Sequence, residues 1–291
     1  MIFSKVLNDI KTLKIQGAEN VAISAVACLK ELADRKSSPK VLLGAAEQLA
    51  KTRPTEPCMQ NALHYLVKET AEEDLWIEVS ERAEQALRHF SDSKRRIAEE
   101  TNRKIVNGMT IFTHCHSSTI IDCLLLAKKQ GKSFNVNVTE TRPLFQGRIT
   151  ATELAKAGIP VMFYADAAAR FALKKADMML IGADAITADG KVINKIGSEL
   201  HAIVAQKYDL PVYVCTDSWK FDPRSVFGYE RELEMRNQKE IWDKPPKGVS
   251  VSNFVFERID PKLITAMISE LGVCRSEIFG RTALEAYPWF F

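Results

Sequence analysis

The chain has 291 residues, of which 46% are hydrophobic and 26% charged, and its formal net charge at pH 7 is +3. A chain of this length can bury a sizeable core, in one large domain or two of ordinary size, and its composition is typical of globular proteins. A net charge so near zero argues against a dedicated nucleic-acid or membrane-surface binder.

The N-terminus and the cysteines indicate where the protein works. Lys5, Asp9 and Lys11 interrupt any apolar segment of a signal peptide, and no stretch reaches the about 18 uninterrupted apolar residues of a membrane span. The six cysteines are scattered and form no CxxC pair, which disfavours a disulfide framework or a zinc cage. We therefore expect a cytoplasmic protein with reduced cysteines that binds neither membranes nor nucleic acid.

Residues 1–105 carry the pattern of a helical N-terminal domain. Apolar residues recur at helical spacing, as Val6, Ile10 and Leu13 do near the start. Prolines, among them Pro39 and Pro57, divide this region into segments. The pattern predicts four or five helices.

The sequence pattern changes near Met109, where short runs rich in β-branched and aromatic residues alternate with helical stretches. This alternation predicts a Rossmann-like α/β domain over residues 106–291, with a mostly parallel sheet and helices on both faces. Asp189-Gly190, between apolar residues, indicates a hairpin turn. The expected strands are Met109–Cys115, Phe134–Glu140, Val161–Asp166, Met178–Asp184 and Val212–Asp217, and the expected helices are Ser117–Lys129, Thr150–Ala157, Ala167–Lys175 and Ser198–Tyr208.

Reactive or charged side chains stand where each of these strands ends. Ligands of open parallel sheets bind outside the carboxyl ends of the strands, so these side chains are candidates for a site. For any one of them, the alternative is a polar residue that simply meets water. The residues are Cys115, Glu140, Asp166, Asp184 and Asp217.

Cys115 lies in Thr-His-Cys-His-Ser-Ser, directly before a helix expected to begin near Ser117. A thiol at a helix N-terminus beside His114 and His116 can have a lowered pKa and act as a base or nucleophile, although many such cysteines are only small buried side chains. The two histidines do not predict a metal, because a catalytic zinc needs three protein ligands and no third one follows at suitable spacing. Neither a metal nor a cofactor is expected.

Asp184 follows an apolar run, which favours a desolvated carboxyl with the raised pKa of a general acid. Nearby Lys195 opposes this shift, so the direction stays open. For an anion, Ser117-Ser118 and Gly197-Ser198 each open a helix, where free amides and the helix dipole favour negative charge. Basic residues in the loops near these ends can also bind an anion, unless they are merely solvated. They are Arg53, Arg142, Lys195 and Lys220.

Longer blocks of the chain carry a more specific pattern. They are Thr113–Ser118, Val138–Pro143 with Gln146-Gly147, Gly158–Val161, Gly182–Asp184 and Val192–Gly197, with fainter ones at Ile15–Ala18, Thr52–Thr55 and Ser218–Phe221. Together they resemble the family that joins ribose-1,5-bisphosphate isomerase, methylthioribose-1-phosphate isomerase and the regulatory subunits of translation initiation factor two-B. The resemblance covers most of the chain and is strongest to the archaeal ribose-1,5-bisphosphate isomerases.

The resemblance implies an aldose–ketose isomerase, because the isomerases of this family carry a Cys where Cys115 stands and an Asp where Asp184 stands. It also implies ribulose 1,5-bisphosphate as product, a role in nucleotide recycling, and homo-oligomers built from dimers, often hexamers. Without a metal, Cys115 would act as the base and Asp184 as the acid. The implied substrate-binding positions are Gly17, Arg53, Arg142, Asn194, Lys195 and Lys220.

Gln16 is the main departure, because the isomerases have Arg-Gly-Ala where this chain has Gln16-Gly17-Ala18. A neutral amide cannot replace a bidentate Arg on a phosphate. Two alternatives therefore stay open. One is a non-catalytic regulatory subunit that senses sugar phosphates or nucleotides, and the other is methylthioribose-1-phosphate isomerase, which needs an apolar pocket in place of a second phosphate site.

Overall fold

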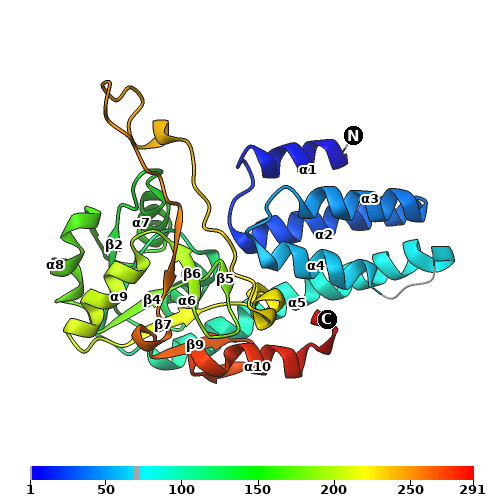
Figure 1. Ribbon diagram of the computed structural model, residues 1–291. Coiled ribbons are helices and arrows are strands. Elements are labelled where there is room, and N and C mark those ends of the chain that lie inside the picture. Colours follow the sequence, from blue (N-terminus) through cyan, green and yellow to red (C-terminus); the bar gives the residue numbers. More distant parts are fainter. Residues whose placement is uncertain (1, 69–71) are drawn as a thin grey trace.

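The N-terminal part of the protein is a bundle of helices that lies beside a sheet (Figure 1). The structure, a computed structural model, describes residues 2–68 and 72–291. Pro39 and Pro57 stand in the first turn of their helices, where a missing N–H costs nothing because it has no partner there. The prediction of four or five helices is confirmed by α1 (Ile2–Lys11), α2 (Ala18–Asp34), α3 (Pro39–Ala50), α4 (Pro57–Val67) and α5 (Leu75–Lys104).

A mostly parallel sheet forms the second part. Its strands are β1 (Thr110–Thr113), β2 (Asn135–Thr139), β3 (Val161–Tyr164), β4 (Met178–Ile181), β7 (Val212–Cys215), β9 (Ala266–Ser269) and β10 (Gly272–Cys274). They lie in the order β10-β9-β7-β4-β1-β2-β3, and neighbours are parallel except for β10 against β9. The predicted parallel α/β sheet is confirmed, and all five expected strands are present.

Helices cover both faces of this sheet, because successive side chains of a strand point to opposite sides. The covering helices are α6 (Ser118–Lys129), α7 (Gln146–Lys156), α8 (Ala169–Leu173), α9 (Ser198–Lys207) and α10 (Ser276–Ala286). Ile111 and Leu180 face a buried cluster shared with α6, α7 and the end of α5, whereas Phe112 and Met179 face one shared with α8, α9 and α10.

The second of these clusters continues into α2, α4 and α5, so the helical part and the sheet share buried apolar surface. The expected boundary at residues 105 and 106 falls between α5 and β1. The division into two domains stays a prediction. None of the helices in the described ranges is long and apolar enough to cross a membrane.

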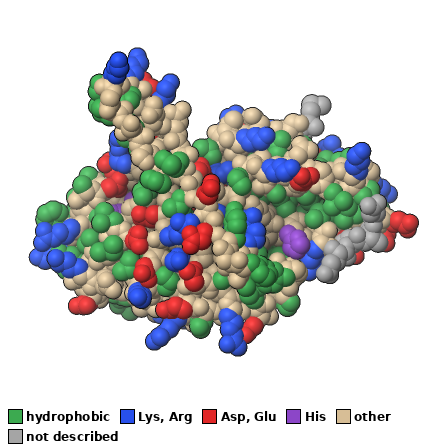
Figure 2. Space-filling view, in the orientation of Figure 1, with side chains coloured by type: hydrophobic (Ala, Val, Ile, Leu, Met, Phe, Trp, Pro, Cys, Tyr) green, Lys and Arg blue, Asp and Glu red, His purple; other side chains and the backbone are tan. Residues whose placement is uncertain are grey.

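A small antiparallel sheet stands beside the cavity described below. It consists of β5 (Ala185–Ile186), β6 (Val192–Lys195) and β8 (Phe256–Ile259), and the hairpin predicted at Asp189-Gly190 joins β5 to β6. Before β8, residues 229–255 form an extended arm that projects from the body of the molecule (Figure 1). At its base Met235 and Phe254 pair as an isolated antiparallel bridge. Basic and apolar side chains gather at its tip (Figure 2).

Candidate active site

A cavity of about 510 Å³ opens at the carboxyl ends of β1 and β4, which are neighbours in the sheet. On one side of β1 lies β2, the next strand in the chain. On its other side lies β4, which is followed in the sheet by β7, so the strand order reverses between β1 and β4. Open α/β sheets bind ligands at such points. Cys115 follows β1, Asp184 follows β4, and both residues line the cavity.

Three of the five strand-end residues lie elsewhere. Asp166 accepts hydrogen bonds from the backbone N–H groups of Thr141 and Arg142, at 2.8 and 2.7 Å, and so shapes the loop after β2. Asp217 pairs with His89 at 3.0 Å. Of the described residues that line the cavity, none is Glu140, Asp166 or Asp217. Of the five side chains that the strand-end rule selected, the structure therefore brings Cys115 and Asp184 to one cavity and places the other three away from it.

The backbone of Cys115 has a φ of 68°, in the left-handed region that non-glycine residues rarely adopt. Two hydroxyl groups hold it there. The N–H of Cys115 donates to Thr141 Oγ1 at 3.0 Å, and its carbonyl accepts from Thr150 Oγ1 at 2.8 Å. Strained backbone of this kind persists only where the surroundings enforce it, and it fixes the direction of the thiol.

The histidines on either side of Cys115 do not supply it with positive charge. His114 is buried, with Nδ1 2.6 Å from Thr139 Oγ1 and Nε2 2.9 Å from the carbonyl of Ile196. Burial lowers the pKa of His114 to about 4 and also lowers the pKa of His116, so both rings are neutral at pH 7.

The expected lowering of the Cys115 pKa is wrong. Burial raises the pKa of the thiol to about 11, and the nearby Lys195 ammonium only partly opposes the shift. The prediction failed because it treated the neighbouring histidines as charged and the site as open to water. The Cys115 thiol is therefore protonated at pH 7.

Asp184 shows the behaviour that the apolar run before it favours. Burial raises the pKa of its carboxyl, although Lys220, Lys195 and Arg53 all oppose the shift. The sequence left the direction of this pKa shift open, and in the structure the pKa of Asp184 is raised. A carboxyl that holds its proton more tightly is better suited to donate it as a general acid near neutral pH.

Close approaches at two glycines pack strand exits against helices: Gly182, after β4, meets the start of α6, and Gly147, in α7, meets the end of β2. A Cβ at Gly182 would lie 2.6 Å from Ser117 Oγ, and one at Gly147 would lie 1.8 Å from the carbonyl oxygen of Thr139. Ser117 caps α6, since its side chain accepts from the N–H of Ile120. Ser117 and Ser118 line the cavity at this helix N-terminus, as Gly17 does at the start of α2.

Two buried ammonium groups face the cavity. Lys195 is 8% exposed and Lys220 is 5% exposed. Among the described residues, neither has a carboxylate within 4.0 Å, and Lys195 Nζ lies 4.8 Å from the centre of the Phe256 ring. A buried cation without a partner carries a desolvation cost, which a bound anion would offset. Asn194, also on β6, lines the cavity and donates to Ser198 Oγ at 3.2 Å.

Arg53 also lines the cavity, but its charge is already shared. Its guanidinium lies 2.6 Å from Glu56 Oε1 and 3.2 Å from Glu234 Oε2. Glu56 is 3% exposed, and burial raises the pKa of its carboxyl to about 7. Glu56 and Arg236 both line the cavity and were not predicted. Arg236 comes from the arm, whose irregular chain gives no periodic signal, and Glu56 stands among the turn residues before Pro57.

Two predicted anion donors are not at the cavity. Arg142 is exposed, and its guanidinium lies 5.1 Å from the centre of the Phe145 ring. The helix opened by Gly197-Ser198 is occupied at its N-terminus by the Glu257 carboxylate, which accepts from the N–H of Glu199 at 2.7 Å. Gln16 lines the cavity as an exposed, neutral side chain.

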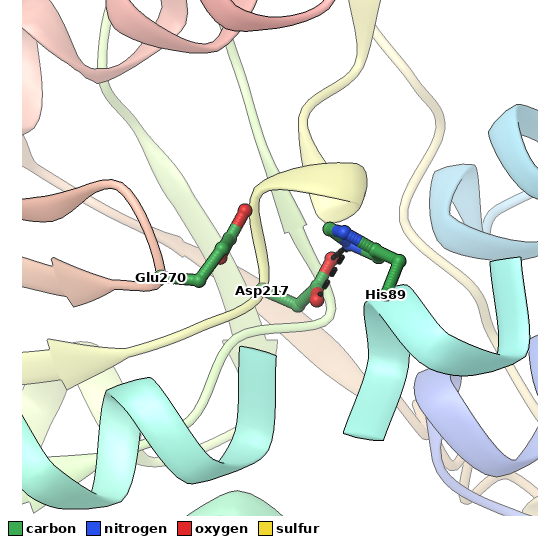
Figure 3. A group of neighbouring side chains, drawn as sticks. All are labelled: His89, Asp217 and Glu270. Carbon is green, nitrogen blue, oxygen red and sulfur yellow. Dashed lines mark hydrogen bonds and ion pairs between the residues drawn. The ribbon is translucent and has the colours of Figure 1, made fainter. Parts of the chain in front are cut away.

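Figure 3 shows a second cluster, formed by His89 of α5 with Asp217 and Glu270, which follow β7 and β9. In the described ranges it is the one group of His, Cys, Asp or Glu residues with the spacing of metal ligands, within 4.8 Å of one another. Glu270 accepts from the N–H of Ser218 at 3.1 Å, from the Ser218 hydroxyl, and from Tyr287 Oη at 3.3 Å. Through these contacts and the pair of His89 with Asp217, the cluster links α5 to the sheet.

A thiol and a carboxyl at adjacent strand exits line one cavity with two buried lysines, in a doubly wound α/β protein. Comparison with known proteins agrees with this class. The chain matches the Initiation factor 2 subunit family over residues 14–276, and it belongs to that family.

Named relatives include both enzymes and initiation-factor subunits. The ribose 1,5-bisphosphate isomerase of Pyrococcus furiosus is 34% identical, over 99% of this chain and 94% of that protein. The methylthioribose-1-phosphate isomerase of Exiguobacterium sibiricum is 31% identical, over 93% and 85%. Among solved structures, the translation initiation factor eIF-2B of Pyrococcus horikoshii OT3 superposes with a TM-score of 0.83 at 27% identity, covering 94% of this chain and 96% of that one.

Proposed function

We propose that this protein is an aldose–ketose isomerase that converts ribose 1,5-bisphosphate to ribulose 1,5-bisphosphate. The observation that carries the proposal is that Cys115 and Asp184 line one cavity of about 510 Å³ together with two buried lysines. A thiol, a carboxyl and fixed cations are the groups needed to move a proton between two carbons of a sugar phosphate. The Pyrococcus furiosus relative carries the name of this activity.

The chemistry follows from the blocked anomeric carbon, since a sugar with phosphate on C1 cannot open to a free aldehyde. Cys115, as thiolate, removes the proton from C2 while protonated Asp184 donates to the ring oxygen. The bond between C1 and the ring oxygen breaks, and an enol forms between C1 and C2. Cys115 then returns the proton to C1 as Asp184 accepts the hydroxyl proton from the oxygen on C2. No redox partner is needed, because the oxidation of C2 balances the reduction of C1.

The remaining roles divide between phosphates and sugar. Lys195, Lys220 and the amides at Ser117-Ser118 are suited to phosphate, because they combine fixed charge with the N-terminus of α6. We also assign four further residues of this cavity to substrate binding: Gln16, Gly17, Arg53 and Asn194.

The test of this proposal uses two conservative variants. Cys115→Ser and Asp184→Asn should each lower kcat by about 10²–10⁴-fold, the usual contribution of a general acid or base. Substrate affinity should stay within a few-fold, because both replacements keep the shape of the site. NMR of ribose 1,5-bisphosphate incubated with each protein measures product formation. Near-full activity in either variant would show that the roles are misassigned.

A second candidate function is a non-catalytic regulatory subunit, favoured by Gln16 and by the likeness to eIF-2B. The same NMR experiment on the unaltered protein separates the two functions. Binding without turnover across pH and temperature would favour the regulator. Competition between ribose 1,5-bisphosphate and methylthioribose 1-phosphate tests the remaining alternative.

We also propose a homo-oligomer built from dimers, with a hexamer as the larger assembly, and a cytoplasmic location. Exposed apolar side chains support an interface, because the arm presents Met235 and Trp242 at 56% and 48% exposure. Analytical ultracentrifugation would contradict this assembly if the protein sediments as a monomer at micromolar concentration.

A further inference from the structure

We infer that Arg236, at the base of the arm, supplies the phosphate-binding cation that Gln16 cannot supply. The inference rests on the proposed function and extends it, because it assigns one phosphate group of the substrate to a residue outside the motifs of the sequence. Both side chains line the 510 Å³ cavity.

Gln16 is not arranged as an anion donor. Its Nε2 donates to the carbonyl of Leu13 at 2.7 Å, so the amide is tied to its own turn. A substrate with two phosphates brings several negative charges, and a neutral amide offsets none of them. A phosphate at this end of the cavity therefore needs a cation other than Gln16.

Arg236 is held in place by backbone and side-chain contacts. Its N–H donates to the carbonyl of Asn253 at 3.0 Å, and the N–H of Val255 donates to the carbonyl of Glu234 at 3.1 Å, which pairs the two chains of the arm. The Arg236 side chain is only 10% exposed. A cation positioned in this way loses little entropy when it binds an anion.

Glu234 orients the guanidinium of Arg236 by accepting a hydrogen bond from its Nε. Its Oε1 accepts from Arg236 Nε at 2.7 Å, while its Oε2 lies 3.2 Å from Arg53. Among the described residues, no side chain or carbonyl accepts a hydrogen bond from the two terminal nitrogens of Arg236. Those nitrogens form the fork that binds phosphate in bidentate fashion.

The base of the arm lies close to the turn that carries Gln16. Leu13, whose carbonyl holds Gln16, lines a smaller cavity of about 310 Å³ together with Arg53 and Arg236. Lys14 also lines the main cavity, but its side chain is 70% exposed and lies 3.6 Å from Asp9. Arg236 is therefore the better-ordered cation at this end.

The experiment measures affinity and turnover separately. Arg236→Gln should weaken the Kd of ribose 1,5-bisphosphate, measured by calorimetry, by about tenfold or more, the loss expected when one charged, bidentate contact disappears. Its kcat should change by less than about threefold, since the acid and base are untouched. Lys239→Gln is the matched control, because it removes one positive charge from an exposed position of the same arm and does not line the cavity.

Restoring the cation at the other position completes the test. Adding Gln16→Arg to Arg236→Gln should recover most of the lost affinity, which a purely structural Arg236 would not allow. Equal affinity in Arg236→Gln and Lys239→Gln, or no recovery in the double variant, would overturn the inference. Inorganic phosphate serves as a second probe. If the unaltered protein binds phosphate but neither binds nor converts ribose 1,5-bisphosphate, the proposed function fails. The role of Arg236 is then tested by comparing the phosphate affinities of Arg236→Gln and the unaltered protein.

Discussion

At the scale of single residues, burial raises the pKa of both reacting groups. The pKa of Cys115 is raised to about 11, and the pKa of Asp184 is raised from its ordinary value of 3.8. Both shifts favour the protonated form, which suits Asp184 as an acid but leaves Cys115 as a thiol at pH 7. Cys115 must therefore lose its proton before it can act as the base of the first step.

The raised thiol pKa predicts the alkylation of Cys115. Reaction of the ligand-free protein with iodoacetamide should be slow at pH 7 and should accelerate about tenfold per pH unit towards pH 11, because only the thiolate reacts. Mass spectrometry of the peptide that carries Cys115 measures the rate.

Lys195 provides the control for the cause of this shift. Lys195→Met removes the ammonium that stabilises the thiolate, so the pKa of Cys115 should rise further and alkylation at a given pH should slow. An alkylation rate already at its maximum at pH 7, or faster in Lys195→Met, would contradict the assignment of burial as the dominant cause.

At the scale of elements, the site depends on how closely β4 passes the start of α6. Gly182→Ala would bring a methyl group to 2.6 Å from Ser117 Oγ. We expect the cap of α6 to shift, with a loss of about 1–3 kcal/mol in the free energy of unfolding and a larger proportional loss of turnover. Denaturant titration and the NMR assay measure the two effects.

Gly44 in α3 offers a matched control, because a Cβ there meets nothing within 4 Å. Gly44→Ala should raise the free energy of unfolding by up to about 1 kcal/mol, since alanine is the better helix former, and should leave turnover unchanged. If the two alanine variants behave alike, the close approach at Gly182 has no special role.

Predictions from the sequence succeed where one element carries its own signal. The strands from Thr110 to Cys215 are short, apolar and regularly spaced, and the strand-end rule then brings Cys115 and Asp184 to one edge. After Asp217 the signal fails, because β8 carries Glu257 and Arg258 between its apolar ends and β10 is only three residues long. Arg236 could not be predicted, since its position depends on pairing across the arm.

At the scale of the whole molecule, the cluster of His89, Asp217 and Glu270 joins the longest helix to the sheet (Figure 3). Burial opposes charge on His89, but the Asp217 carboxylate outweighs this and raises the pKa of the ring. His89 in turn overcomes the effect of burial on Asp217 and lowers the pKa of that carboxyl. Burial and then Asp217 raise the pKa of Glu270 to about 7.

These shifts fix the sign of the pH dependence. The native state holds a proton on Glu270 between its ordinary pKa of 4.5 and about 7, so the folded protein loses stability as pH rises through that range. The His89 contribution is complete below its ordinary pKa of 6.5 and disappears as pH rises through the raised value. The Asp217 contribution is present above its ordinary pKa of 3.8 and disappears only in acid.

Glu270→Gln should therefore stabilise the protein at pH 8 and have little effect at pH 5. The amide resembles the protonated carboxyl in shape, can bond to the Ser218 and Tyr287 hydroxyls, and never has to ionise in a buried place. At about 1.4 kcal/mol per pKa unit, the gain at pH 8 has an upper limit of about 3 kcal/mol. Denaturant unfolding at the two pH values measures the difference.

The control is Glu285→Gln on α10, whose carboxyl is 65% exposed and should contribute equally to stability at both pH values. Equal destabilisation by Glu270→Gln at both pH values would mean that Glu270 is ionised throughout and stabilises the link through its charge.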